Sequence, residues 1–230
     1  MAIYCYLFYF TYKHKLFILL NPCSPMHQIV AMTGGVLKNI SELPPHISFD
    51  EYNKLLAAVD KYFEGLKPTK KRDFFRARDK LFLFLLWETG GRVGDICNLR
   101  VGDFDFNRRV LNLRVKKTKK TTTVTLDDRA CFEVSEYLRN YHVEDALFDL
   151  TPQRAWQLVK RYAKEAGIED VHPHKFRHGL AIYLLSQNVP IPVISARLGH
   201  SSVYITMQLY MKVTAEIQRR FLENIPMRSD

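Results

Sequence analysis

The sequence predicts an α+β fold that is mostly helical and contains one small antiparallel sheet of three strands. Two observations predict it. Apolar residues recur at helical spacing along most of the chain after residue 45, and one segment near the middle changes to strand-like alternation. A hydrophobic content of 47% and a charged content of 25% over 230 residues are typical of a chain with a substantial core. We therefore expect one main domain, residues 46–230, preceded by an appendage.

The first expected helix begins at Ser48. Glu51 follows by three residues, which is the spacing of a capping box. Four apolar residues then fall on one helical face: Leu55, Leu56, Val59 and Phe63. Gly65 and Pro68 end this helix, because neither residue favours its continuation.

A second helix is expected over residues 76–89. It is apolar on nearly every side, so it should lie at the centre of the domain. Gly90 and Gly91 end it, and a short helix follows within residues 92–100. Alternation rich in Val, Thr and Phe in residues 104–117 and 121–128 predicts the sheet, whose last hairpin turns through residues 118–120.

Helical patterns return in the second half of the chain. We expect helices over residues 131–140, 152–166, 174–187, 192–198 and 202–211, and a C-terminal helix over residues 214–225. That last helix has an apolar stripe at four-residue spacing, formed by Val213, Ile217, Phe221 and Ile225. The simplest interpretation is that the stripe packs on the protein's own core.

Residues 1–45 are expected to form an N-terminal extension and linker without a clear structural pattern. Lys13, His14 and Lys15 interrupt an apolar start, leaving two pieces too short to span a bilayer and unlike a secretory signal. Met26 and Met32 are alternative starts, so we leave open whether residues 1–31 are translated. We predict no membrane partner.

Charge and cysteine content narrow the class of partner. Lys and Arg total 34 against 24 Asp and Glu, which gives a net charge of +10. Such a surface favours a polyanion, although charge alone leaves open a basic protein without one. The four cysteines are scattered and form no C-x-x-C pair, which argues against a disulfide framework or zinc ribbon and favours the cytoplasm.

Four short segments carry residues suited to phosphate chemistry. They are "ETGGRVGDICNLR" around Arg92, the lysine-rich hairpin "VKKTKKTTTVTL", "HPHKFRHGLAIYLL" with His174 and Arg177 three residues apart, and "RLGHSSVYITMQLYMKV" with His200 and two tyrosines. Taken singly, each is more often a solvated turn or a structural ion pair. Their combination and order are the informative feature.

In this order the segments resemble the catalytic domain of the tyrosine recombinase (phage integrase) family, from about His46 to Val213. "TGGRVGDICNLR" is similar to the family's Thr-Gly-x-Arg turn, with Asp95 where glutamate is more common. "HPHKFRHGLAIYLLSQNVPIPVISARLGHSS" is similar to the second family box. Here the tyrosine lies one position further from Gly-His than in many members.

The resemblance implies a site-specific DNA recombinase that cuts and rejoins double-stranded DNA through a 3′-phosphotyrosyl intermediate. It implies six catalytic residues: Arg92, Lys117, His174, Arg177, His200 and Tyr210. Arg92 and Arg177 would clamp the phosphate, and His174 would shuttle the tyrosine's proton. His200 would donate a hydrogen bond to the phosphate. The reaction needs no cofactor, metal or small-molecule substrate.

The lysine assignment depends on the hairpin register. Counting back from "VTL" gives Lys117 as the acid for the leaving oxygen, with Lys116 and Lys119 as alternatives. We expect four lysines to contact DNA: Lys116, Lys119, Lys120 and Lys175. Tyr204 and Tyr210 are six positions apart and so cannot share a helical face. The family position makes Tyr210 the nucleophile.

Several alternatives stay open. A zinc site at His172, His174 and His178 has no nearby cysteine or carboxylate to complete it. A type IB topoisomerase uses a similar catalytic set, and a remnant that binds DNA without cutting it would keep the same motifs. Family members usually carry a DNA-clamping domain before the catalytic one, so this chain resembles a viral or plasmid integrase without that domain. The family's C-terminal helix implies a homo-oligomer on DNA.

Overall fold

The computed structural model describes residues 8–12, 15–19, 43–115, 120–200 and 202–223, with the side chains of residues 8–19, 115, 120 and 216–223 left out. The chain divides into two units, Met1–Glu42 and Leu43–Asp230. In the first unit, β1 (Phe8–Tyr12) pairs antiparallel with β2 (Lys15–Leu19). The sequence analysis had assigned no structure to this region. The domain boundary near residue 45 stays a prediction.

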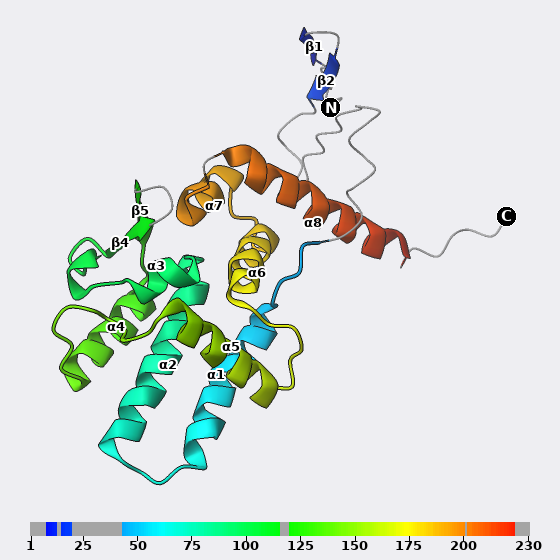
Figure 1. The fold of residues 1–230 in the computed structure, drawn as a ribbon. Helices are drawn as coiled ribbons and strands as arrows, with labels where there is room; N and C mark the ends of the chain where they lie inside the picture. The colour runs from blue at the N-terminus through cyan, green and yellow to red at the C-terminus, as the bar shows by residue number, and fades with distance from the viewer. Residues whose placement is uncertain (1–7, 13–14, 20–42, 116–119, 201, 224–230) are drawn as a thin grey trace, which may run out of the picture. The chain divides into compact units, whose positions relative to one another are not determined.

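The second unit is predominantly helical (Figure 1). Its elements in chain order are α1 (Phe49–Glu64), α2 (Lys70–Thr89), α3 (Val93–Cys97), the 3-10 turn η2 (Val101–Asp103), β3 (Phe104–Asp105), β4 (Val110–Val115), β5 (Lys120–Thr125), α4 (Asp128–Asn140), α5 (Pro152–Glu165), α6 (Pro173–Ser186), α7 (Ile191–Leu198) and α8 (Val203–Glu223). The predicted mostly helical α+β class is confirmed. Within the described residues, no helix is long and apolar enough to cross a membrane.

The start of α1 confirms the predicted capping box. Ser48 Oγ accepts a hydrogen bond from the Glu51 backbone at 3.1 Å, and the Ser48 backbone donates to Glu51 Oε2 at 2.7 Å. These bonds satisfy amide groups that the first helical turn leaves without partners. The predicted C-terminal boundary also holds, because α1 ends at Glu64 with Gly65 as its cap.

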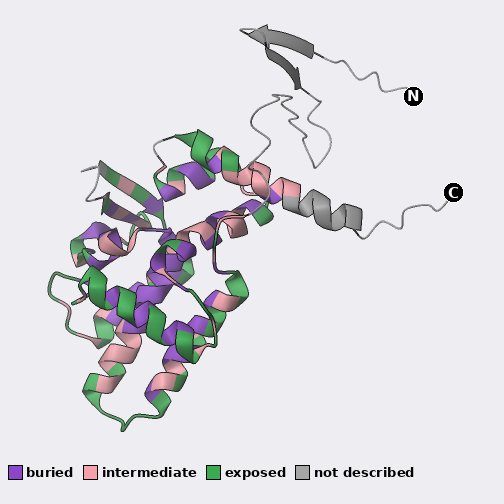
Figure 2. Ribbon diagram, turned by 45° about the vertical axis from the view of Figure 1, so that its right-hand side comes forward, coloured by how far each residue is buried: buried purple, intermediate pink, exposed green. Residues whose placement is uncertain are grey.

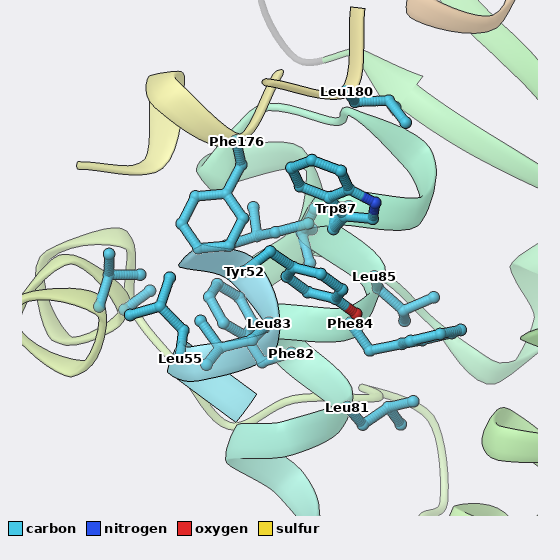
Figure 3. Packing of buried hydrophobic residues seen from close by; sticks show 14 of the residues in the cluster. Tyr52, Leu55, Leu81, Phe82, Leu83, Phe84, Leu85, Trp87, Phe176 and Leu180 are labelled. Carbon is cyan, nitrogen blue, oxygen red and sulfur yellow. The ribbon is translucent and has the colours of Figure 1, made fainter. Parts of the chain in front are cut away.

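Helix α2 is the central element of the domain, as predicted. All seven residues from Leu81 to Trp87 are buried, and they pack against α1, α4 and α6 (Figures 2 and 3). The Trp87 ring stacks on Tyr52 of α1, with centroids 4.8 Å apart. The helix begins at Lys70, six residues before the predicted start. Thr69 caps it by accepting from the Arg72 backbone, and its polar first turns carry no apolar period for the sequence to reveal.

The predicted three-stranded antiparallel sheet is confirmed, with strand order β3-β4-β5. Leu111 of β4 lies opposite Val124 of β5, and both are buried. Val115 pairs with Lys120, so the two strands extend to the edge of the hairpin tip. The tip itself, residues 116–119, lies outside the described part of the chain.

The prediction of separate helices over residues 202–211 and 214–225 is wrong. They form the single helix α8, Val203–Glu223. The junction contains Met211, Lys212 and Val213, none of which breaks a helix, and Val213 is buried. Of the predicted apolar stripe, the side chains of Ile217, Phe221 and Ile225 lie outside the described set.

Candidate active site

The glycine turn after α2 brings Arg92 to the start of α3. Gly90 has φ of 60°, in the left-handed region that favours glycine, and a Cβ there would lie 2.5 Å from Leu198 Cδ2. Arg92 is the N-cap residue of α3, and its Nη1 lies 3.8 Å from Asp95 Oδ2. The side chain of Arg92 is 38% exposed, so its guanidinium is accessible to a ligand.

Arg177 of α6 joins that turn to the end of α7. Its Nη1 donates to the Gly90 carbonyl oxygen at 2.8 Å, and its Nη2 donates to the Leu198 carbonyl oxygen at 2.6 Å. Burial, and then the nearby charge of Arg92, lower the pKa of Arg177 to about 10. The group therefore stays protonated at neutral pH, and its remaining N–H groups can serve an anion.

His200 follows the glycine that ends α7. Gly199 has φ of 60°, and a Cβ there would lie 2.6 Å from Thr122 Oγ1 of β5, so this loop and the hairpin strand approach closely. His200 Nδ1 lies 2.7 Å from Thr206 Oγ1 of α8. Burial, and then the charges of Arg177 and Arg92, lower the pKa of His200 to about 4, which keeps the imidazole neutral near pH 7.

These three side chains form a group that suits an anion. Arg92 and Arg177 carry like charges close enough to affect each other's environment, and both act on His200. Holding two guanidinium groups together in a partly buried place is unfavourable unless an anion offsets the repulsion. A cavity of about 210 Å³ lies beside Arg177 and His200, and Leu209 of α8 lines it.

Two predicted catalytic residues lie apart from this group. Tyr210 is partly buried in α8 and packs against the hydrophobic core, while Tyr204 is 56% exposed. His174 is exposed in the first turn of α6, its ring centroid 6.4 Å from that of His172. Among the described residues, no hydrogen bond joins His174 or Tyr210 to Arg92, Arg177 or His200.

The predicted lysines cannot all be placed. Lys116, Lys117 and Lys119 lie outside the described residues, and only the backbone of Lys120 is described, at the start of β5. Lys175 is buried, and its Nζ lies 3.0 Å from Asp170 Oδ2. That bond lowers the pKa of Asp170. Since the charge of Lys175 is already paired, its role in DNA binding stays a prediction.

The sequence analysis missed Arg197, which ties α7 to two other elements. Its Nη1 donates to the Thr125 carbonyl of β5 at 3.0 Å, and its Nη2 donates to the Glu88 carbonyl of α2 at 2.6 Å and forms an ion pair with the Glu88 carboxylate. Arg197 therefore fixes the strand after the lysine hairpin against the loop that holds His200. No local pattern marks this role, because both partners are distant in sequence.

The histidines of the alternative zinc site contact other groups. His172 stacks on Trp156, and His178 Nδ1 lies 3.1 Å from the Pro45 carbonyl oxygen. In the part of the chain that the structure describes, no group of three His, Cys, Asp or Glu side chains is arranged to hold a metal ion.

The sequence profile described as "Phage integrase family" matches residues 45–216 of the chain. The chain therefore belongs to the phage integrase family, which confirms the resemblance seen in its motifs. Among similar proteins, the tyrosine recombinase XerA of Pyrococcus horikoshii is 32% identical over 191 residues, covering 79% of this chain and 61% of the relative. XerA of Thermococcus onnurineus is 35% identical over 191 residues, covering 79% and 62%. The chain thus spans about three fifths of the length of these relatives.

Solved structures support the fold. A crystal structure of XerA recombinase matches with a TM-score of 0.62 at 24% identity, covering 82% of this chain and 66% of that chain. The catalytic domain of bacteriophage HP1 integrase matches with a TM-score of 0.57 at 19% identity, covering 80% of this chain and 96% of that chain. The expected recombinase catalytic fold is confirmed.

Proposed function

We propose that this chain cuts and rejoins double-stranded DNA through a covalent bond between a tyrosine and a 3′-phosphate. The observation that carries the proposal is the group formed by Arg92, Arg177 and His200, three donors from separate elements around one anion-sized position. Membership of the phage integrase family supports it, as does the similarity to proteins named tyrosine recombinase XerA.

In the proposed reaction, the two guanidinium groups bind the non-bridging oxygens of a phosphodiester. Charge builds up on these oxygens as the phosphorus becomes five-coordinate, so fixed cations stabilise the transition state more than the bound substrate. Arginine suits this task, because its planar N–H groups can contact two oxygens at once. The neutral imidazole of His200 adds a donor without adding a third charge to the site.

The nucleophile is Tyr210. Its phenolic oxygen forms a bond to phosphorus while the bond from phosphorus to the 5′-oxygen breaks, which leaves a 3′-phosphotyrosyl ester and a free 5′-hydroxyl. His174 accepts the tyrosine's proton, and Lys117 supplies a proton to the leaving oxygen. Attack by a 5′-hydroxyl on the ester reverses the step, so the phosphate bond is kept and no cofactor is consumed.

Double-stranded DNA is the proposed partner, and the net charge of +10 supports it. A solved complex of XerH recombinase with its difH substrate has the same fold, with a TM-score of 0.60 at 24% identity, covering 74% of this chain and 51% of that chain. We further propose a homo-oligomer on DNA, assembled through the second half of α8, and action in the cytoplasm, where the element's DNA lies.

A covalent trap tests the proposal. The full chain is incubated without metal with nicked, end-labelled duplexes, comprising a randomised library and the difH sequence, so that cleavage releases a short fragment and prevents rejoining. The proposal predicts a labelled protein–DNA adduct on a denaturing gel that is lost in Tyr210→Phe and kept in Tyr204→Phe. Measurable DNA binding with no adduct would indicate instead a remnant that binds DNA without cutting it.

A second arm separates the proposed recombinase from a topoisomerase. The wild-type chain is incubated with supercoiled plasmid bearing two copies of any duplex that gives the adduct. Exchange between the two sites supports site-specific recombination, whereas relaxation without exchange supports type IB topoisomerase activity.

A further inference from the structure

Thr206 is a polar residue with no exposed surface, 0% accessible, in the first turns of α8. Its hydroxyl oxygen lies 2.7 Å from His200 Nδ1. Within the described residues, His200 is the single hydrogen-bond partner of this hydroxyl. A buried hydroxyl without a partner costs about 1–3 kcal/mol, so this bond accounts for the presence of a polar group there.

The environment of the bond indicates its direction. If His200 donated from Nδ1, the hydroxyl hydrogen of Thr206 would need another acceptor, and the described residues supply none. If the hydroxyl donates to Nδ1, both groups are satisfied. A neutral imidazole carries one proton, so accepting at Nδ1 places the proton on Nε2. Nε2 is then the nitrogen that can donate to a phosphate oxygen.

The position of Thr206 links this donor to the nucleophile. Thr206 precedes Tyr210 by four residues on the same helix, so the two lie one turn apart on nearly the same face. The hydrogen bond therefore joins the helix that carries Tyr210 to the loop that carries His200. Docking of α8 and orientation of the imidazole depend on the same contact.

We propose that Thr206 is a positioning residue, which holds His200 in the Nε2-protonated form and couples that form to the seating of the Tyr210 helix. This inference rests on the proposed function. Arg177 and Arg92 favour a neutral imidazole by their charges, but charge does not choose between its two tautomers. Thr206 makes that choice.

The first test observes the tautomer directly, without DNA or turnover. The full chain is labelled with ¹⁵N-histidine, and His200 is assigned by loss of its signals in His200→Asn. The two nitrogens of a neutral imidazole give well separated ¹⁵N shifts according to which one carries the proton. We expect the proton on Nε2 in the parent. A parent His200 protonated mainly on Nδ1 would overturn the inference.

The second test uses a matched pair of variants. Thr206→Val keeps the shape of the side chain and removes the hydroxyl, while Thr206→Ser keeps the hydroxyl and removes a methyl group. Thr214→Val, two turns further along α8, is the control for the same substitution on the same helix. We expect Thr206→Val to slow adduct formation at saturating DNA by about tenfold to a hundredfold, because one transition-state donor is no longer oriented. Thr206→Ser and Thr214→Val should stay within about threefold of the parent.

The outcomes separate this inference from the proposed function. An active parent with Thr206→Val and Thr206→Ser equally fast, or equally slow, contradicts the positioning role, because the hydroxyl would then not decide the rate. A parent that binds DNA and forms no adduct contradicts the proposed function. In that case the ¹⁵N measurement still decides whether Thr206 fixes the tautomer of His200.

Discussion

Arg177 Nη1 donates to the carbonyl oxygen of Gly90 at 2.8 Å across 87 residues of sequence. Together with its bond to the Leu198 carbonyl, this contact lets one guanidinium organise the site as well as bind an anion. A lysine has one nitrogen in place of three and cannot make both backbone bonds and a two-pronged phosphate contact.

The first prediction follows from this double role. Arg177→Lys keeps the charge, but we expect adduct formation to fall by about a hundredfold or more, since loss of one fixed transition-state donor has effects of that size. DNA affinity should change much less. The measurement is single-turnover cleavage alongside a binding titration. Cleavage within a few-fold of the parent would show that charge alone suffices at this position.

The second prediction concerns the turn that Arg177 contacts. Gly90→Ala introduces a Cβ at a positive φ and 2.5 Å from Leu198 Cδ2, so we expect a loss of about 1–3 kcal/mol in the free energy of unfolding. Gly94→Ala is the matched control, because a Cβ at Gly94 meets nothing within 4 Å. Urea denaturation compares the two variants. Equal stabilities would contradict the account of this turn.

The third prediction uses the ion pair of Arg197 with Glu88, whose side chains are 21% and 22% exposed. Arg197→Ala should cost about 2–3 kcal/mol, between a surface pair and a fully buried one, because burial already raises the pKa of Glu88 and its charge would lose its partner. A double-mutant cycle with Glu88→Gln isolates the pair.

Arg100 provides the control for that pair. It lies 2.8 Å from Asp145 with both side chains more than half exposed, so Arg100→Ala should cost no more than about 1 kcal/mol. If Arg197→Ala were as mild as Arg100→Ala, Arg197 would not be the tie between α7, β5 and α2 that its contacts indicate.

The fourth prediction is a pH dependence of stability. Burial, Arg177, Arg92 and His178 hold the pKa of His200 at about 4, below the usual 6.5. The unfolded chain therefore binds a proton at this histidine before the folded chain does. Stability is complete above about pH 6.5 and is lost as the pH falls toward 4. In His200→Asn, chemical denaturation between pH 7 and pH 4.5 should show a smaller loss than in the parent. Identical slopes would contradict this assignment.

The sequence predicted those parts of the structure that depend on local signals. The capping box at Ser48 and the apolar run of α2 both appear as expected. The start of α2 was missed, because a polar first turn capped by Thr69 has no apolar period. The continuity of α8 was missed because a gap in an apolar pattern resembles a break, although no residue there stops a helix.

The candidate site shows the same division. The motifs identified Arg92, Arg177 and His200, and the structure brings these three together. Thr206 and Arg197 were missed, because their partners are set by tertiary packing. One signal was available for Thr206: it is a small polar residue one helical turn before Tyr210 and six residues after His200. Arg197 offered none, since its partners Glu88 and Thr125 are remote in sequence.

The central claim is that Tyr210 forms the bond to DNA, and mass spectrometry of the trapped adduct tests it most directly. Trypsin cleaves after Arg197 and Lys212, so residues 198–212 form one peptide that contains both Tyr204 and Tyr210. After nuclease digestion of the adduct, fragmentation of this peptide locates the remaining nucleotide. The account predicts the nucleotide on Tyr210 with Tyr204 unmodified, whereas a nucleotide on Tyr204, or on any other residue, would contradict it.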